Sequence, residues 1–171
     1  KMALTASGKM CGSVSGGCVE GAVVEAAKQV FNSGQSNLLE FGVTDDTAWD
    51  VGLACGGTIS VFLQLLNEDI FRAIRASDNE RLAILTVIDG SEDLVGRQLV
   101  VDDNGSRTGS INSNMDNDAL SIARDSLQQG DSKTAKLRDS IELFVEVISA
   151  PLTLILIGGV HIAIPLSEMA K

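Results

Sequence analysis

A glycine-rich stretch with an embedded cysteine most constrains how this chain can fold: Gly-Ser-Val-Ser-Gly-Gly-Cys-Val-Glu-Gly at residues 12–21. From Val19 onward, apolar residues recur at the spacing of one buried helix face, which predicts a strand, a tight turn and a helix. Gly16 and Gly17 can adopt positive φ and let a ligand approach the backbone closely. Cys18 then lies in the first helical turn, where free N–H groups and the helix dipole favour an anion, either a bound phosphate or the thiolate itself.

A second cysteine also stands beside a pair of glycines. Cys55 precedes Gly56 and Gly57, and the alternating, β-branched run at residues 59–65 predicts a strand. Two cysteines in such settings suit an anionic, thiol-reactive or metal-bearing ligand. The alternative interpretation is that both are small core residues beside tight turns, because buried cysteine is common.

Together with two further motifs, these stretches resemble the XdhC/CoxI family of xanthine dehydrogenase accessory factors. The further motifs are Phe-Gly-Val at residues 41–43 and Ile-Gly-Gly-Val-His-Ile-Ala at residues 157–163. The resemblance implies a chaperone that binds the molybdenum cofactor (molybdopterin), a pterin dithiolene with a phosphate tail. It would deliver this cargo to a molybdenum hydroxylase apoenzyme. Family members carry a further helix and strand before the first strand, so we expect the chain to be truncated at its N-terminus. We expect truncation at the C-terminus as well, because a Rossmann-like unit begins there and stops before its second strand.

The resemblance also implies which residues form the site. Cys18 and Cys55 correspond to the family's cysteine pair and would face the molybdenum or dithiolene end, since soft thiolates suit such a centre. The phosphate would rest on backbone N–H groups of residues 16–19. His161 matches the family's Gly-His pair, either as a ligand-facing imidazole or as a surface turn residue. The expected cofactor-binding residues are Ser15, Gly16, Gly17, Cys18, Val19, Cys55, Gly56, Gly57 and His161.

The rest of the chain predicts an α/β (α+β) fold with a mixed sheet and helices. A hairpin is expected at residues 2–14, with Cys11 packed on its second strand, followed by a helix at 19–31 and a strand at 38–41. A helix capped by Asn67 or Asp69 would bury Ile70, Phe71 and Ile74. A strand buried on both faces follows at 82–88. A second hairpin at 98–111, a helix at 118–128 and a strand at 141–147 complete the pattern.

The two halves predict a duplicated unit of hairpin and helix, about residues 1–66 and 82–148, within a domain of residues 1–150. Gly12 aligns with Gly109 and Ser13 with Ser110, all at one offset. At this offset Met115 replaces Cys18, so only the first unit keeps the reactive residues. Divergence of one unit into a site and the other into a scaffold, or drift in a structural duplication, would each produce this difference.

Residues 151–171 predict the beginning of a Rossmann-like domain. Pro151 marks the boundary, residues 152–157 read as a buried strand, and a helix is expected from Ile162 onward. Val160 stands where the second glycine of the dinucleotide fingerprint belongs, and its side chain would obstruct a pyrophosphate. NAD binding by this chain is therefore not expected.

Composition excludes some classes of partner. The net charge of -10, with 44% hydrophobic residues, fits an acidic globular protein and argues against nucleic-acid binding. No membrane partner is expected either. Three cysteines without paired spacing predict a reducing, cytoplasmic compartment. By resemblance, the partners are an apo-hydroxylase of the xanthine dehydrogenase type and a cysteine desulfurase. Exposed sheet edges also predict a homodimer.

Two alternatives to the chaperone remain open. A thiol-dependent enzyme would use Cys18 as a nucleophile activated by the helix N-terminus, but no base stands near it in the sequence. A non-catalytic assembly module would have inert cysteines and an acidic docking surface. The carboxylates of Glu20 and Glu25 are expected in first-turn and helix-surface roles rather than in acid–base catalysis.

Overall fold

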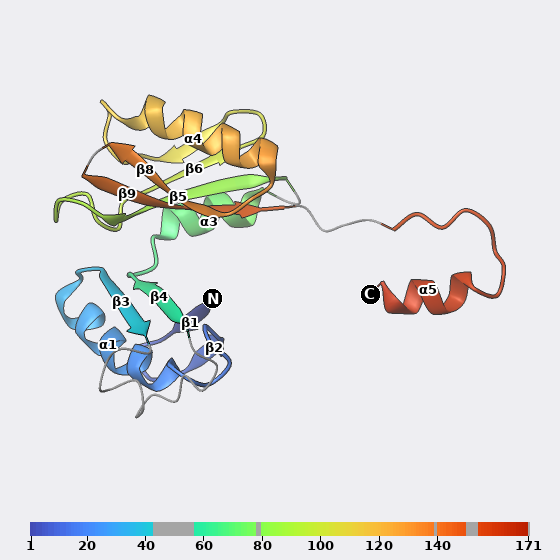
Figure 1. Ribbon diagram of the computed structural model, residues 1–171, viewed down its shortest axis with the longest axis horizontal. Helices are drawn as coiled ribbons and strands as arrows, with labels where there is room; N and C mark the ends of the chain where they lie inside the picture. The colour runs from blue at the N-terminus through green and yellow to red at the C-terminus, as the bar shows by residue number, and fades with distance from the viewer. Residues whose placement is uncertain (43–56, 78–79, 139, 150–153, 171) are drawn as a thin grey trace.

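The computed structural model describes residues 1–42, 57–77, 80–138, 140–149 and 154–170. It comprises an N-terminal lobe (residues 1–63), a five-stranded lobe (residues 82–148) and a C-terminal tail (residues 154–170), as Figure 1 shows. Helices and strands occur together in both lobes, which confirms the predicted α/β class. In chain order the elements are β1 (Met2–Leu4), β2 (Met10–Gly12), α1 (Glu20–Ser33), β3 (Asn37–Gly42), β4 (Thr58–Leu63), α3 (Glu68–Ala76), β5 (Leu82–Asp89), β6 (Gln98–Asp102), β7 (Arg107–Gly109), α4 (Asp116–Gln129), β8 (Lys133–Arg138), β9 (Ile141–Ile148) and α5 (Ala163–Met169).

Two hairpins and one helix form the N-terminal lobe. β1 pairs antiparallel with β2 in the predicted hairpin, and β3 pairs antiparallel with β4, with Gly42 opposite Thr58. α1 ends at Ser33 and is capped by Gly34, which has a φ of 74° and whose N–H bonds to the carbonyl of Val30. Val19, Val23, Ala27 and Val30 are buried along one face of this helix.

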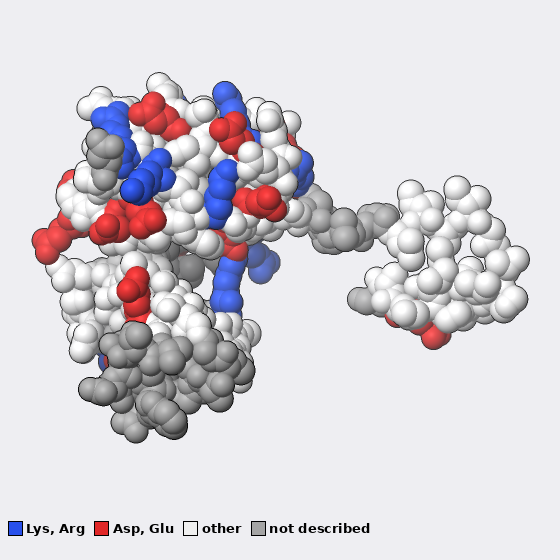
Figure 2. Space-filling model, viewed as in Figure 1, with Lys and Arg blue, Asp and Glu red and all other residues white. Residues whose placement is uncertain are grey.

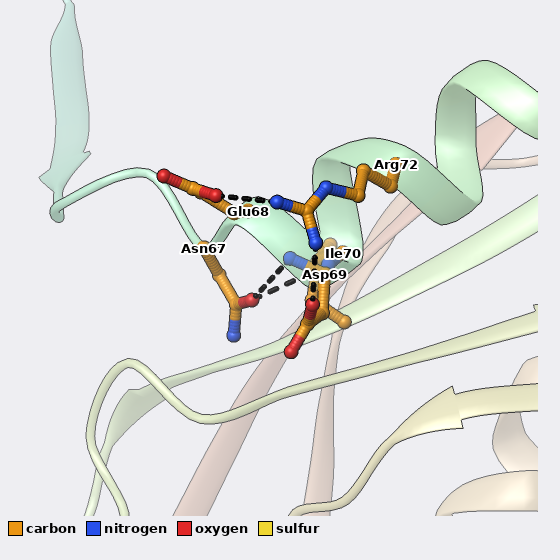
Figure 3. A network of polar contacts seen from close by, with 5 residues as sticks. All are labelled: Asn67, Glu68, Asp69, Ile70 and Arg72. Atoms are coloured by element: carbon orange, nitrogen blue, oxygen red, sulfur yellow. Dashed lines mark hydrogen bonds and ion pairs between the residues drawn. The ribbon is translucent and has the colours of Figure 1, made fainter.

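The short helix α3 begins with a side-chain cap. The Asn67 Oδ1 atom accepts hydrogen bonds from the N–H groups of Asp69 and Ile70 at 3.1 and 3.3 Å, which Figure 3 shows. The Arg72 guanidinium also reaches Glu68 and Asp69 in this first turn. Ile70 is buried, but Phe71 is 45% exposed, so the predicted stripe on this helix is narrower than expected.

The five-stranded sheet has the order β7-β6-β5-β9-β8. Every described pairing is antiparallel, whereas the sequence analysis expected a mixed sheet. The difference arises because β5 pairs with consecutive β6 on one side and runs antiparallel to β9 on the other, while α4 carries the chain from β7 at one edge of the sheet to β8 at the opposite edge. As predicted, β5 is buried on both faces. Leu85 and Val87 lie in the α4-side core, and Leu82 and Ile84 pack with Ile70 of α3.

The tail differs from its expected Rossmann-like form. Residues 154–157 have no strand assignment and are exposed, where a buried strand was predicted. A buried strand needs a hydrogen-bonded neighbour, and no strand of the described ranges pairs with these residues. Helix α5 forms close to its predicted start, with Pro165 in its first turn, where a missing N–H is tolerated.

Candidate functional site

The predicted site loop, residues 13–19, connects β2 to α1. Gly16 and Gly17 have φ values of 80° and 120°, which confirms the expectation that both take up positive φ. A Cβ atom built on either glycine would meet nothing within 4 Å. These two glycines therefore allow the backbone to turn, and no neighbouring atom of the described residues covers the outer side of the loop beside them.

The carboxylate of Glu20 lies inside this loop and is held by five hydrogen bonds. Its Oε1 accepts from the Ser13 hydroxyl at 2.6 Å and from the N–H groups of Val14 and Ser15 at 3.1 and 3.0 Å. Its Oε2 accepts from the Ser15 hydroxyl at 2.6 Å and from the N–H of Gly17 at 2.9 Å. The hydroxyls of Ser13 and Ser15, with the Ser15 N–H, hold the pKa of Glu20 well below its ordinary value.

The remaining N–H groups of the loop bond to the two serine hydroxyls. Ser15 Oγ accepts from the N–H groups of Cys18 and Val19, each at 3.0 Å, and Ser13 Oγ accepts from the Gly16 N–H at 2.9 Å. Every backbone N–H from residue 14 to residue 19 thus has a partner within the loop. An anion does occupy this helix start, as the sequence suggested, but it is the chain's own Glu20. A phosphate at residues 16–19 would have to replace these partners.

The cysteines differ in their surroundings. Cys18 is half-buried and packs against the core of the N-terminal lobe. Cys11 was expected to pack, but it is exposed. The reason is that all three residues of β2 are exposed on the short two-stranded sheet.

The second predicted cysteine motif falls mostly outside the described residues, which exclude Cys55 and Gly56. Gly57 is described: it is exposed, has a φ of 101° and directly precedes β4. Because β3 follows α1 after a tight turn and packs back along it, β3 ends near the start of α1 (Figure 1). The chain therefore leaves β3 at Gly42 and re-enters β4 at Thr58 on the side of the lobe where Cys18 lies.

The structure does not bring His161 to this loop. His161 is exposed in the turn before α5, on the tail that Figure 1 shows apart from the N-terminal lobe. Within the described ranges, no three His, Cys, Asp or Glu side chains gather into a possible metal site. A shallow groove of about 540 Å³ lies beside α3 and Gly109, and its lining includes none of the predicted site residues that the structure describes. None of the described helices is long and apolar enough to cross a membrane.

The five-stranded lobe contains a related loop without the glycines and cysteine. Asp116 accepts from the Ser110 hydroxyl at 2.6 Å and from the N–H groups of Ile111 and Asn112 at 2.9 and 3.1 Å. Burial raises the pKa of Asp116, but these hydrogen bonds and nearby Arg107 outweigh it and hold the pKa below its ordinary value. The carboxylate that fastens the loop is therefore common to both lobes.

This comparison corrects the alignment made from the sequence. The N–H of Val23 bonds to the carbonyl of Val19, and the N–H of Ala119 bonds in the same way to that of Met115. Met115 therefore corresponds to Val19, not to Cys18. The loop of the N-terminal lobe is thus one residue longer than the related loop of the five-stranded lobe, and the extra residue falls within Gly-Gly-Cys.

The role of Glu20 was missed by sequence reasoning, which assigned it only to the first turn. A signal for it was present, because an acid at the start of a helix can accept hydrogen bonds from the free N–H groups of the loop that precedes it. The N–H of Gly17, three residues before Glu20, makes such a bond. Two serines upstream, Ser13 and Ser15, supply the other donors.

Comparison with known proteins places these features in a family context. A model of the XdhC and CoxI family matches residues 1–42. The molybdenum cofactor insertion chaperone PaoD of Escherichia coli (strain K12) is 37% identical over 67 residues. That match covers 39% of this chain and 20% of PaoD, so the chain spans about a fifth of the length of this relative. Over its first 42 residues, which include the hairpin, the glycine-rich loop and α1, the chain resembles the XdhC and CoxI family, as its motifs predicted.

Proposed function

We propose that this chain carries part of the cofactor-binding region of a molybdenum cofactor insertion chaperone. The observation that carries the proposal is that the family match at residues 1–42 contains the entire glycine-rich loop and its cysteine. The similarity to PaoD, a protein named for insertion of this cofactor, points in the same direction. The cofactor would be cargo, bound and passed on rather than used in catalysis.

In this proposal Cys18 is the residue that meets the cofactor in the described part of the site. Its thiol sits at the start of α1, half-buried against apolar neighbours and next to a loop whose outer side is open at Gly16 and Gly17. A thiolate is a soft ligand that suits a molybdenum–dithiolene group. Cys55, Gly56 and Gly57 would complete the site from the segment that re-enters the sheet at Thr58.

The phosphate end of the cofactor requires a more specific arrangement. The donors of residues 14–19 are satisfied by Glu20, Ser13 and Ser15, so the loop is fastened before any ligand arrives. A phosphate would bind there only by replacing the Glu20 carboxylate, which has the same charge sign and uses the same donors. We therefore assign Ser15, Gly16, Gly17 and Val19 the role of positioning Cys18. The phosphate would contact the loop only in a state in which the Glu20 carboxylate has moved away from these donors.

The recipient would be an apo molybdenum hydroxylase of the xanthine dehydrogenase type, with a cysteine desulfurase as a further partner. A thiol-dependent enzyme has less support. His161 is the single histidine of the chain, and it is exposed on the tail apart from Cys18. A nucleophilic thiol usually needs a base within hydrogen-bond reach.

The test is cofactor retention. The chain is mixed with free molybdenum cofactor and desalted, and its molybdenum and pterin contents are measured beside those of Cys18→Ala, Cys55→Ala and Cys11→Ala. We expect near-stoichiometric retention that is lost in Cys18→Ala and Cys55→Ala. Cys11→Ala is the matched control, since Cys11 is an exposed thiol on β2 and should keep the cofactor. Equal retention by all four proteins, or none by any folded sample, would contradict the proposal.

A further inference from the structure

The anion position of the glycine-rich loop is filled by a side chain of the chain itself. The Glu20 carboxylate accepts five hydrogen bonds of 2.6 to 3.1 Å, from the hydroxyls of Ser13 and Ser15 and from three backbone N–H groups. All five donors are uncharged. The two hydroxyls lower the pKa of this carboxyl and keep it ionised at neutral pH, so the filled loop carries one negative charge.

No nearby cation offsets that charge. Residues 12–21 contain no Lys or Arg, and neither do residues 43–56 between β3 and β4. Among the described residues, Lys28 pairs with Glu25, and no Lys or Arg pairs with Glu20. On the face drawn in Figure 2, the Lys and Arg side chains lie mainly over the five-stranded lobe. A phosphate site commonly adds a lysine or an arginine to its backbone N–H groups, so a phosphate that approached this loop would be repelled.

The related loop of the five-stranded lobe shows that such a carboxylate is a fixed part of the fold. Asp116 accepts hydrogen bonds from Ser110, Ile111 and Asn112, although that loop lacks the glycine pair and the cysteine. A carboxylate that is kept in a loop without the residues expected to bind cargo serves the fold. We therefore expect Glu20 to stay in place when a ligand arrives.

Glu20 also fixes the surroundings of Cys18. The Ser15 hydroxyl donates its single proton to Oε2 of Glu20, so its oxygen accepts from the N–H groups of Cys18 and Val19. These bonds hold the turn that carries the cysteine. They use the N–H of Cys18 and not its thiol, which is left for a ligand.

We propose that Glu20 determines which end of the cargo this loop accepts. Its carboxylate keeps the anion position filled, so the phosphate end is excluded and the molybdenum–dithiolene end approaches the thiol of Cys18. The phosphate end then lies outside the loop of residues 13–19. Because it concerns the cargo of that site, this role of Glu20 rests on the proposed function.

Titration of the whole chain with inorganic phosphate, followed by amide NMR, tests this role. We expect no saturable shift of the amide signals of residues 14–19 in the unaltered chain. In Glu20→Ala the donors lose their occupant, so phosphate should bind there at least tenfold more tightly. Asp116→Ala is the matched control, since it removes the corresponding carboxylate from the five-stranded lobe and should leave residues 14–19 without phosphate binding.

A gain of phosphate binding separates this role from a purely structural one, because a loop that is only loosened would not gain a ligand. Glu20→Gln is a second variant in case the alanine chain does not fold. It keeps the shape of the side chain, loses the charge and should gain phosphate binding to a smaller extent. Saturable shifts at residues 14–19 in the unaltered chain would overturn the proposal whether or not either variant folds. So would folded Glu20 variants that bind phosphate no better than the unaltered chain.

Competition during cofactor retention distinguishes this role of Glu20 from the proposed function. The chain should retain molybdenum cofactor equally well with and without a hundredfold excess of inorganic phosphate. Retention that falls with phosphate would mean that the loop holds the phosphate end, which would overturn the role of Glu20 while the proposed function stands. A folded chain that retains no cofactor in either condition would contradict the proposed function. The phosphate titration needs no cofactor and would still decide whether Glu20 excludes anions from the loop.

Discussion

Two glycines of the five-stranded lobe, Gly105 and Gly109, share one backbone conformation but differ in the space around them. Alanine at each position would therefore separate the cost of backbone strain from the cost of steric conflict. Gly105 and Gly109 have φ values of 83° and 84°, so an alanine at either position would be destabilised by the left-handed backbone conformation. The free-energy cost of this conformation for a residue with a Cβ atom is about 1–2 kcal/mol. Reduced freedom of the unfolded chain offsets about 0.4–1 kcal/mol of it. Near Gly105, the new methyl group would meet only the end of the Arg124 side chain, at 3.5 Å. The free energy of unfolding should therefore fall by about 1 kcal/mol in Gly105→Ala.

Gly109 has much less space. A Cβ atom there would fall against the backbone carbonyl of Gln98 on β6 and lie 2.9 Å from Cδ1 of Ile70. The carbonyl belongs to an inner strand of the sheet and cannot move without disturbing the pairing of β6 with β5. Overpacking of this kind costs about 1–3 kcal/mol. The total loss in Gly109→Ala should be about 2–4 kcal/mol, including the conformational penalty.

The corresponding pair in the N-terminal lobe is Gly8 and Gly12. Gly8 has open space, whereas Gly12 faces the carbonyl of Lys1. Lys1 precedes a three-residue strand in a two-stranded sheet, so it should yield more easily than Gln98. Gly12→Ala should thus lie between Gly8→Ala and Gly109→Ala. Urea unfolding followed by circular dichroism measures the losses, and hydrogen exchange assigns them to a lobe. Equal losses in Gly105→Ala and Gly109→Ala, within about 0.5 kcal/mol, would show that the sheet absorbs the methyl group and that the steric argument is wrong.

Two further predictions concern the site loop. The pKa of Glu20 is lowered in the folded chain, so the unfolded chain binds the proton more tightly, and α1 should lose hydrogen-exchange protection as the pH falls below 4.5. In Glu20→Gln, α1 should have weaker hydrogen-exchange protection at neutral pH and should lose less of it on acidification. If the pH dependence were unchanged in this variant, Glu20 would not be the group that fastens the loop. In a Cys55→Ser background, Ellman's reagent should react quickly with exposed Cys11 and more slowly with half-buried Cys18. Cys18→Ser should then remove the slow phase alone, and loss of the fast phase instead would contradict the burial argument.

Local chemistry explains which parts of the fold the sequence predicts well. The hairpin turns and the ends of α1 and α4 depend on glycines that adopt positive φ, and such residues are visible in a sequence. The buried strand β5 is likewise visible as a continuous apolar run. β8 was missed because Lys-Thr-Ala-Lys-Leu-Arg is mostly polar. It lies at the edge of the sheet, where only Leu137 is buried and lysines suit an exposed edge.

Features set by distant or absent neighbours were predicted poorly. Residues 154–157 have the composition of a buried strand, but a strand forms only where another strand pairs with it. The correspondence between the two lobes shifted by one residue because a single offset cannot detect an insertion. Hydrogen bonds to Glu20 and Asp116 reveal that insertion, since equivalent donors fasten both carboxylates although their loops differ in length.

The inserted residue bears on how the proposed binding site differs from the related loop of the five-stranded lobe. Both loops are fastened by a carboxylate from the first turn of the following helix, so the fastening does not depend on loop length. An added residue can then be accommodated between the fastened points without moving the helix or the hairpin. In the N-terminal lobe the lengthened part contains Gly16 and Gly17 at positive φ, with Cys18 directly after them. The feature that distinguishes the two loops is thus the Gly-Gly-Cys segment, and the carboxylate that holds it is scaffold. Substitution of Cys18 should therefore impair ligand retention with little effect on folding, whereas substitution of Glu20 should affect both.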